Sequence, residues 1–425
     1  MIKFFSKVLL ISFLITGIPA SVYTQAQEMV ESIYEDLEIF ANTLMIVKRH
    51  YVEAVSSKDL IYGSLQGMLA SLDPHSQFML PDEYKEIREE TEGRFGGIGI
   101  EITIREGVLT VITPVIGGPA AEQDVAPGDL IVKIDGESTR DLNLSEAVKK
   151  LRGKPGSNVK LTLLREETSQ VIDVEIRRDI IQVQSVRDAK MLTDHIAYVR
   201  IADFQETTYQ DLTQALQKFD SESMKGLILD LRNNRGGLLD AAVAVCEEFL
   251  PEGTLVVKTK SRDSSQNEEF RVHRVSSNPD YPIVVLINKG SASASEIVAG
   301  ALQSHRRGII VGTTSFGKGS VQTVIPMADG SAVRLTTSYY YTPDDHKIHG
   351  KGIIPDVQVD ASNKPAAEPH SEKEIENKEN RIYKQLLVPS EEIQKDEIQH
   401  LREEDVQLDR AIDILTALNV YRSPS

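Results

Sequence analysis

The sequence of 425 residues predicts an α/β core with a mixed, largely parallel sheet, a β-rich domain inserted ahead of it, and helical segments at both ends. Three observations predict this fold class. Short apolar strands alternate with helices over residues 179–360, which is typical of layered α/β domains. Short alternating runs separated by Gly-containing turns fill residues 93–178. Residues 27–92 and 391–425 have apolar side chains at helical spacing.

The first 26 residues have the layout of a secretory signal peptide. Two lysines precede an apolar run at 8–18, and Gly17 and Pro19 end that run before the ~20 residues that a membrane span needs. Small residues at Ala20 and Ala26 offer cleavage points. We therefore expect an exported, periplasmic or extracytoplasmic protein; an uncleaved N-terminus that anchors the chain to the membrane is the alternative.

The helical segment 27–92 is predicted from spacings such as Leu37, Phe40 and Leu44, with a break at 73–75. The inserted domain, 93–178, has four predicted strands and one predicted helix. The strands are 98–104, 108–112, 130–134 and 159–164, and the helix is 144–151.

The α/β core is predicted over 179–360. Its expected strands are 196–201, 226–230, 283–287, 308–312 and 331–341, and its expected helices are 208–219, 241–249 and 294–304. Residues 361–390 are rich in Glu, Lys, Pro and Asn with few apolar residues, which predicts a disordered acidic linker. Residues 391–425 return to a helical pattern.

Composition excludes several classes of function. The net charge of −17 argues against nucleic-acid binding, which needs a basic surface. Because Cys246 is the only cysteine, the chain cannot form an internal disulfide, a Cys-ligated zinc site or an iron–sulfur cluster by itself. Cys246 lies in an apolar helical pattern and is expected to be a buried hydrophobe, not a nucleophile. We expect no metal and no cofactor.

Two further motifs are weak. The segment 312–318 nearly matches a phosphate-binding loop, but position 319 is Gly instead of Ser or Thr, and a strand pattern follows where such a loop needs a helix. His346 and His349 lie in a Gly- and Pro-rich loop and are expected to meet solvent, not a metal.

The chemically suggestive residues follow the predicted strand 283–287. The segment 290–297 holds three serines and opens a helix, so that free N–H groups of the first helical turn would lie beside a serine and could bind an oxyanion. Alternatively, these serines are only helix caps and small packing residues. Downstream, Lys318 lies between two glycines in a segment without other charges. Such surroundings disfavour its ammonium form, so this lysine could accept a proton; a solvent-facing lysine is the alternative.

Several motifs occur in one order along residues 40–360: 71–76, 96–100, 119–121 with 127–129, 230–234 with 236–237, 290–297 and 317–322. In this order they resemble the carboxy-terminal processing peptidases, or tail-specific proteases. The resemblance implies a serine endopeptidase with a Ser-Lys dyad and an embedded PDZ domain, which corresponds here to residues 93–178.

The resemblance implies a role for each matching residue. By position, Ser293 is the nucleophile, Lys318 the general base and Gln322 the residue that orients the lysine, whereas Ser291 and Ser295 do not match the nucleophile. A glutamine carbonyl can hold a neutral amine without favouring its charged form. The oxyanion would be bound by the Ala294 N–H and by a glycine N–H from the pair Gly236 and Gly237.

The PDZ resemblance implies that an extended C-terminal peptide adds to the domain as a strand. Its carboxylate loop would be formed by Gly97, Ile98 and Gly99, followed by the peptide-pairing strand from Ile100 onward. The alternative for this domain is a packing role alone.

The sequence departs from the family at two places inside the match. Arg235 stands where the glycine turn usually has a proline, and 344–346 are Asp-Asp-His where Ser-Gly-Arg is usual. We therefore predict an exported peptidase that binds apolar C-terminal tails and forms a homo-oligomer through its helical segments; the alternative is a non-catalytic PDZ adaptor on a degenerate protease scaffold.

Overall fold

The computed structural model describes residues 20–361, apart from 106, 116, 166–167, 169, 183, 194, 221–223 and 274–279, and then residue 402 and residues 405–422. The chain divides into two units. One comprises residues up to Met79 with Val333–Leu335, and the other comprises Leu80–Ala332 and Thr336 onward. The expected signal run at 8–18 and the expected acidic linker lie outside the described residues.

The N-terminal unit is mainly helical, as the pattern over 27–92 predicts. It holds α1 (Ala20–His50), α2 (Ser57–Ala70) and the unpredicted short strand β1 (Gln77–Met79). The hydroxyl of Ser56 caps α2 by accepting from the Lys58 N–H at 3.2 Å. None of the described helices is long and apolar enough to span a membrane.

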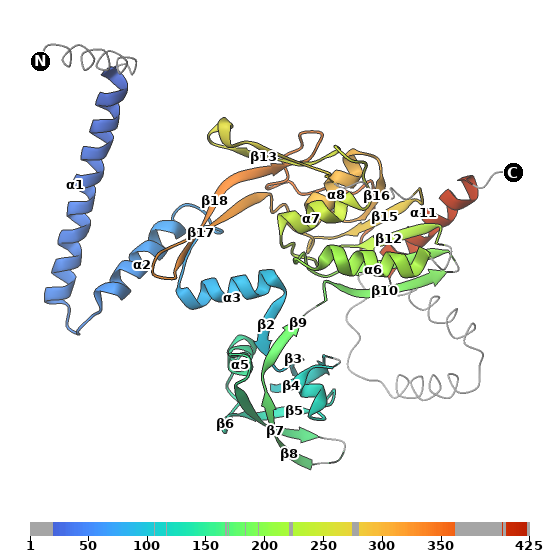
Figure 1. Cartoon of the computed structure of the whole chain (residues 1–425), viewed down its shortest axis with the longest axis horizontal. Coiled ribbons are helices and arrows are strands. Elements are labelled where there is room, and N and C mark those ends of the chain that lie inside the picture. Colours follow the sequence, from blue (N-terminus) through green and yellow to red (C-terminus); the bar gives the residue numbers. More distant parts are fainter. Residues whose placement is uncertain are drawn as a thin grey trace, which may run out of the picture. The chain divides into compact units, whose positions relative to one another are not determined.

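The second unit begins with α3 (Pro81–Glu92) and the inserted domain (Figure 1). A two-stranded ribbon of β2 (Arg94–Gly97) and β9 (Asp179–Gln182) joins the two ends of the insert. Between them lies a sheet in the order β3-β4-β5-β7-β8, with β6 beside β5. The elements are β3 (Ile100–Arg105), β4 (Val108–Pro114), α4 (Pro119–Glu122), β5 (Leu130–Ile134), β6 (Glu137–Ser138), α5 (Leu144–Leu151), β7 (Asn158–Arg165) and β8 (Gln170–Arg177).

An ion pair supports the core of the inserted domain. Arg165 Nε donates to Asp129 Oδ1 at 2.8 Å and Nη2 donates to Oδ2 at 2.9 Å, while the Asp129 side chain is buried. Burial raises the pKa of Asp129, but the hydrogen bonds and charge of Arg165 outweigh this, so that the pKa lies below its usual value. The carboxylate is therefore ionised and paired in the folded domain.

The α/β core is built on a six-stranded sheet in the order β10-β11-β12-β15-β16-β19. β10 pairs antiparallel with β11, and all the other pairs are parallel, as expected for a mixed, largely parallel sheet. The strands are β10 (Val186–Thr193), β11 (Ile196–Ile201), β12 (Gly226–Asp230), β15 (Ile283–Ile287), β16 (Gly308–Gly312) and β19 (Val357–Gln358). The helices are α6 (Thr208–Asp220), α7 (Leu239–Glu247), α8 (Ala294–Ser304) and α11 (Val406–Arg422).

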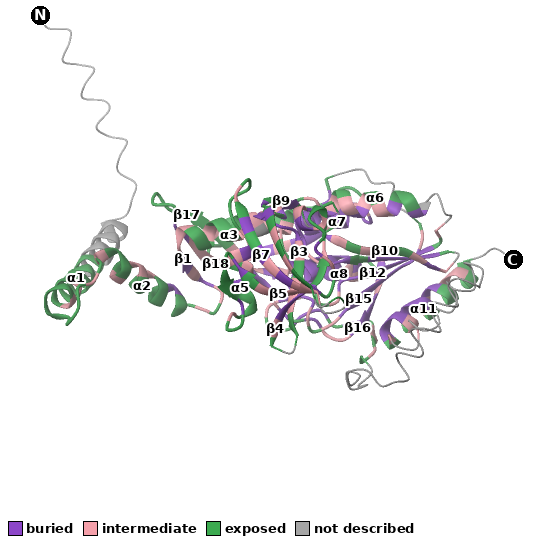
Figure 2. Ribbon diagram, turned by 90° about the horizontal axis from the view of Figure 1, so that it is seen from below, coloured by how far each residue is buried: buried purple, intermediate pink, exposed green. Residues whose placement is uncertain are grey.

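Helices cover both faces of this sheet, which explains why its central strands read as continuous apolar runs. Alternate residues of each strand point to opposite faces. Leu227 and Leu229 pack with α6, α7 and α8, whereas Ile228 packs with α11. The first three helices thus cover one face of the sheet and α11 covers the other (Figures 1 and 2). The predicted C-terminal helical segment therefore includes an element of the core, α11, and its residues before 402 lie outside the described part of the chain.

A second sheet contains strands that the sequence analysis did not predict. Its order is β1-β18-β13-β14, with β17 beside β18. The remaining elements are β13 (Leu255–Ser261), the 3₁₀ turn η1 (Ser264–Gln266), β14 (Glu268–Arg271), β17 (Ser320–Pro326) and β18 (Ala332–Tyr341). Of these strands, β18 and the alternating pattern of β17 were expected.

Candidate active site

Three segments meet at one edge of the parallel sheet. β12, β15 and β16 are neighbours and run parallel, so their carboxyl ends lie side by side. The turn 231–237 follows β12, the segment 288–293 follows β15, and the loop 313–319 follows β16. This edge of an open α/β sheet is where such folds place their ligands.

Ser293 stands at the junction between the strand β15 and the helix α8. As the residue before α8 it has φ 56° and ψ −113°, a backbone conformation that residues other than glycine rarely adopt. The two neighbouring serines have buried hydroxyls with structural tasks: Ser291 Oγ donates to the Leu231 carbonyl at 2.8 Å and Ser295 Oγ to the Asn234 carbonyl at 3.0 Å. Ser293 itself is half-buried. Its position and exposure set it apart from the other two.

One buried carboxylate connects the serine with the lysine loop. Glu296 is fully buried, and its Oε2 accepts from the Ser293 N–H at 2.8 Å and from the Lys318 N–H at 2.9 Å. Its Oε1 accepts from the Ser315 hydroxyl at 2.5 Å and from the Gly317 N–H at 2.7 Å. The amide nitrogens of Ser293 and Lys318 therefore lie within two hydrogen-bond lengths of each other.

The protonation of Glu296 reflects two opposed effects. Burial raises the pKa of its carboxyl, and the four hydrogen bonds that it accepts partly offset that rise because they favour the ionised form. The sequence analysis did not single out this residue. The signal was present, since Ser293 and Glu296 have the S-x-x-E spacing of a capping box, in which the glutamate reaches back to the first N–H of a helix.

Lys318 lies in a loop that packs tightly against a neighbouring segment. It is half-buried, and the glycine that follows it has no room for a side chain, since a Cβ on Gly319 would lie 2.3 Å from the His349 backbone nitrogen. After Gly319 the chain enters strand β17 and not a helix. This confirms that 312–318 is not a phosphate-binding loop.

Gln322 lies four residues after Lys318 on β17. Its Nε2 donates to Thr336 Oγ1 at 2.8 Å and to Ser320 Oγ at 3.2 Å. Its Oε1 is buried, and none of the described residues offers it a hydrogen bond. An unpaired buried acceptor is costly, so this carbonyl is available to a donor that approaches it.

The glycine turn lies directly against Ser293. Asn234 is buried and organises the turn: its Nδ2 donates to the Ile201 carbonyl at 2.8 Å, and its Oδ1 accepts from the Gly236 N–H at 2.8 Å. A Cβ on Gly236 would lie 2.7 Å from Ser293 Cβ and 2.9 Å from the Ala294 nitrogen. Only glycine fits there. The Gly236 N–H is already engaged by Asn234.

Arg235, the residue that replaces the usual proline, is exposed in this turn. The backbone contacts of the turn form nonetheless, because the Asn234 carbonyl accepts from the Ala292 N–H at 2.9 Å and the Gly236 carbonyl accepts from the Phe204 N–H at 3.0 Å.

The inserted domain carries a groove of about 220 Å³ at the predicted peptide loop. Its lining includes the four predicted residues Gly97, Ile98, Gly99 and Ile100, together with Phe95, Glu101, Ile102, Leu144, Val148, Leu151 and Arg152. The sequence analysis missed Arg152, whose guanidinium lies 4.3 Å from the centre of the Phe95 ring. The groove thus combines apolar walls with one cationic residue, Arg152, and one acidic residue, Glu101.

The remaining side chains of interest have structural surroundings. Cys246 is fully buried, and burial raises the pKa of its thiol well above the usual value, as expected for an inert core residue. His346 and His349 are half-buried, so they meet solvent only in part. His346 Nε2 lies 3.2 Å from the Gly352 carbonyl, and the His349 ring packs 4.7 Å from the ring of Tyr339.

Comparisons with known proteins agree with this architecture. Residues 195–359 match the model of peptidase family S41, residues 110–165 match a PDZ domain, and residues 16–83 match the N-terminal domain of the activating protease CtpB. The chain is 32% identical to a solved photosystem II D1 C-terminal processing protease, covering 76% of this chain and 92% of that one with a TM-score of 0.46.

Two curated relatives have a higher sequence identity. The carboxy-terminal-processing protease of Bartonella bacilliformis is 42% identical over 358 residues, which is 82% of each chain. The carboxy-terminal processing protease CtpA of Bacillus subtilis is 36% identical over 315 residues, 74% of this chain and 67% of that one. A PDZ domain precedes the peptidase domain in this chain. Given this order and the similarity to these relatives, the chain belongs to the carboxy-terminal processing proteases, serine peptidases of family S41.

Proposed function

We propose that this protein is an exported serine endopeptidase in which Ser293 is the nucleophile, Lys318 the general base and Gln322 the residue that orients the lysine. The observation that carries the proposal is the pair of hydrogen bonds by which Glu296 Oε2 holds the backbone of both Ser293 and Lys318. One rigid carboxylate thereby keeps the two reacting segments together, and fixed geometry of this kind supplies much of the catalytic advantage.

In the proposed reaction the neutral amine of Lys318 takes the proton of the Ser293 hydroxyl as its oxygen attacks the substrate carbonyl carbon. The Ala294 N–H, at the first turn of α8, and an N–H of the glycine turn bind the oxyanion that forms. The lysine ammonium then gives its proton to the departing amine. Water attacks the resulting ester in the same way and releases the free carboxylate.

Gln322 would assist through its unpaired carbonyl. When the lysine amine approaches, Oε1 accepts a hydrogen bond from it and leaves the nitrogen lone pair directed at the serine. A neutral acceptor does this without favouring the ammonium form, whereas a carboxylate would favour it.

The PDZ groove is proposed to bind the apolar C-terminal tails of protein substrates. Its apolar lining suits an apolar terminal side chain, and the loop at Gly97 and Gly99 suits a carboxylate bound by backbone N–H groups. The tail would pair with the strand that begins at Ile100. Arg152 in the lining supplies a positive charge that favours a carboxylate, and Glu101 in the same lining opposes it.

The N-terminal helices are proposed to mediate self-association. α1 exposes apolar side chains at helical spacing, including Ile33, Leu37 and Phe40, which are 52%, 53% and 41% exposed. An apolar stripe of this kind is typical of a helix that packs against a partner. Sedimentation of the full chain and of a Leu37→Glu variant measures this directly; a monomeric wild-type protein contradicts it.

The catalytic proposal is tested with a peptide that ends in apolar residues. Ser293→Ala is expected to abolish cleavage and labelling by a fluorophosphonate while leaving binding of the tail intact, and Lys318→Ala is expected to abolish cleavage. The rate of the wild-type enzyme is expected to rise with pH as the lysine loses its proton. Lys289→Ala, which removes an exposed lysine four residues before the serine, is the matched control. Unlabelled wild-type protein would favour a non-catalytic PDZ adaptor instead.

A further inference from the structure

Three charged side chains, those of Asp230, Arg232 and Asp405, form a cluster at the start of the turn 231–237. Arg232 Nη1 donates to Asp405 Oδ1 at 2.8 Å and Nη2 donates to Oδ2 at 2.7 Å. On its other side Arg232 donates to Asp230, with Nη2 at 2.6 Å from Oδ2 and Nε at 3.0 Å from both carboxylate oxygens. Tyr198 completes the cluster, since its hydroxyl donates to Asp230 Oδ2 at 2.8 Å. One guanidinium thus lies between two carboxylates that are 175 positions apart in the sequence.

The cluster is largely removed from water. The side chains of Arg232, Asp230 and Asp405 are 14%, 3% and 30% exposed. Burial lowers the pKa of Arg232, but its two carboxylate partners raise that pKa above the usual value. Burial raises the pKa of Asp405, but the hydrogen bonds and charge of Arg232 bring that pKa below its usual value. Arg232 and Asp405 are therefore charged, and removing Arg232 would leave the buried carboxylates without their cation, which is strongly destabilising.

Asp405 belongs to the start of α11. Besides binding Arg232, its Oδ1 accepts from the Leu408 N–H at 3.0 Å, so it also caps the helix. Gln407 adds a third contact, accepting from Arg232 Nη1 at 3.1 Å and donating to the Val359 carbonyl at 2.7 Å. The first turn of α11 is thereby attached to the residues that follow β12 and β19.

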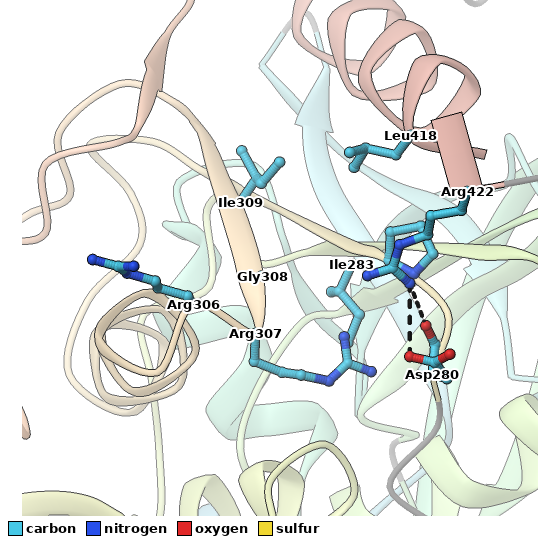
Figure 3. Close-up of a pocket in the computed structure, with 9 residues that line it drawn as sticks. Asp280, Ile283, Arg306, Arg307, Gly308, Ile309, Leu418 and Arg422 are labelled. Atoms are coloured by element: carbon cyan, nitrogen blue, oxygen red, sulfur yellow. Dashed lines mark hydrogen bonds and ion pairs between the residues drawn. The ribbon is translucent and has the colours of Figure 1, made fainter. Parts of the chain in front are cut away.

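The rest of α11 is fixed to the sheet. Its buried side chains pack on the face of the sheet that carries Ile228; they are Leu408, Ala411, Ile412 and Leu415. At the far end Arg422 Nη1 donates to the Asp280 carbonyl at 2.6 Å, beside a pocket lined by Arg307 and Leu418 (Figure 3). A helix attached along its length and at both ends places Asp405 accurately.

The turn that Arg232 belongs to makes direct bonds with the serine segment. The Leu231 carbonyl accepts from Ser291 Oγ, and the Asn234 carbonyl accepts from the Ala292 N–H and from Ser295 Oγ. Arg232 lies between these two carbonyls in sequence. A shift of Arg232 would therefore move the contacts on both sides of Ser293.

We propose that α11 is a positioning element of the active site and that Asp405 is the positioning residue through which it acts. Asp405 holds Arg232 against Asp230, and this holds the turn 231–237 against the nucleophile segment. The C-terminal helix is then required for the geometry of the reaction and not only for closing the apolar core. The inference rests on the proposed role of Ser293.

The experiment compares Asp405→Asn with Asp413→Asn in the full chain. Both remove one carboxylate from α11, but Asp413 pairs with Arg402, outside the cluster. Circular dichroism establishes a temperature at which both variants are folded. At that temperature Asp405→Asn is expected to lower kcat about tenfold with little change in KM, and to slow labelling of Ser293 by a fluorophosphonate to a similar degree. The control is expected to match wild type.

A folded Asp405→Asn enzyme with wild-type kcat and labelling rate overturns the proposal, whatever its melting temperature. Should this variant fail to fold, Asp405→Glu replaces it, since it keeps the charge but lengthens the arm. A folded Asp405→Glu enzyme is expected to have lowered kcat and slower labelling, and wild-type values for it also overturn the proposal. Failure of the proposed catalytic role is distinguishable, because wild-type protein would then be unlabelled or Ser293→Ala would retain turnover.

Discussion

Replacing Glu296 by glutamine should damage both the stability and the activity of this enzyme. The two side chains have nearly the same shape, but glutamine substitutes an NH₂ group for one oxygen. Each oxygen of Glu296 accepts two hydrogen bonds, at distances of 2.5 to 2.9 Å. An NH₂ group in place of Oε2 faces the N–H groups of Ser293 and Lys318. In place of Oε1 it faces the Gly317 N–H, while the Ser315 hydroxyl can rotate and accept from it.

The magnitude follows from the number of donors left unpaired. A buried donor left without an acceptor costs about 1–3 kcal/mol, so the free energy of unfolding should fall by about 1–3 kcal/mol with the NH₂ group in place of Oε1 and by roughly 2–6 kcal/mol with it in place of Oε2. Neither orientation of the glutamine satisfies every donor. If the NH₂ group takes the place of Oε2, the lost acceptors are those of the Ser293 and Lys318 amides, and the two reacting segments are no longer held by one group.

Urea denaturation gives the free energy of unfolding, and peptide cleavage below the transition gives kcat/KM. Glu247→Gln is the control, since Glu247 is also buried and accepts from the His273 N–H at 2.9 Å. It should lose stability but keep the kcat/KM of the folded enzyme. A Glu296→Gln enzyme within ~0.5 kcal/mol of wild-type stability, a typical effect of a neutral surface change, and of unchanged kcat/KM would refute the reasoning.

The other predictions concern separate parts of the chain. Gln322→Glu should move the rise of the pH–rate profile to higher pH, because a carboxylate favours the ammonium form of the neighbouring lysine; an unchanged profile contradicts the orienting role. Asp129→Asn should lower the melting temperature at pH 7. The pKa of Asp129 is lowered in the folded state, so its pairing with Arg165 stabilises the fold above the unfolded value of about 3.9 and is lost as the pH falls through the folded value. The difference between this variant and wild type should therefore shrink towards pH 3, and a constant difference argues against the pairing. Leu415→Ala should cost about 2–5 kcal/mol of unfolding free energy, because Leu415 is fully buried; a loss below ~1 kcal/mol shows that α11 does not dock. Cys246 should resist thiol reagents until the protein unfolds, and rapid labelling of native protein would contradict its burial.

Much of the fold could be predicted because local patterns decided it. The helix α8 and the strands β11, β12, β15 and β16 have the predicted bounds, since each combines a strong apolar pattern with clear turn residues. The strands β13 and β14 were missed. They are half-exposed and polar, as in the LVVKTKS run of β13, so their extended form depends on the pairing with β18 more than on their own sequence.

The expected surface histidines show the same limit. His346 and His349 lie among glycine and polar residues that read as an open loop, but the loop folds back on β18 and half-buries both rings. Burial of a loop residue depends on what packs over it. No local pattern contains that information.

By itself the sequence determined the serine and lysine segments, because each follows an apolar strand and has its own short motif. Only the tertiary structure decided how they are held together. Glu296 binds the amides of Ser293 and Lys318, which are 25 positions apart, and Asp405 reaches Arg232 from the far end of the chain. A hydrogen bond requires two groups to lie about 3 Å apart in space, and periodicity along the chain says nothing about that distance for residues on different elements.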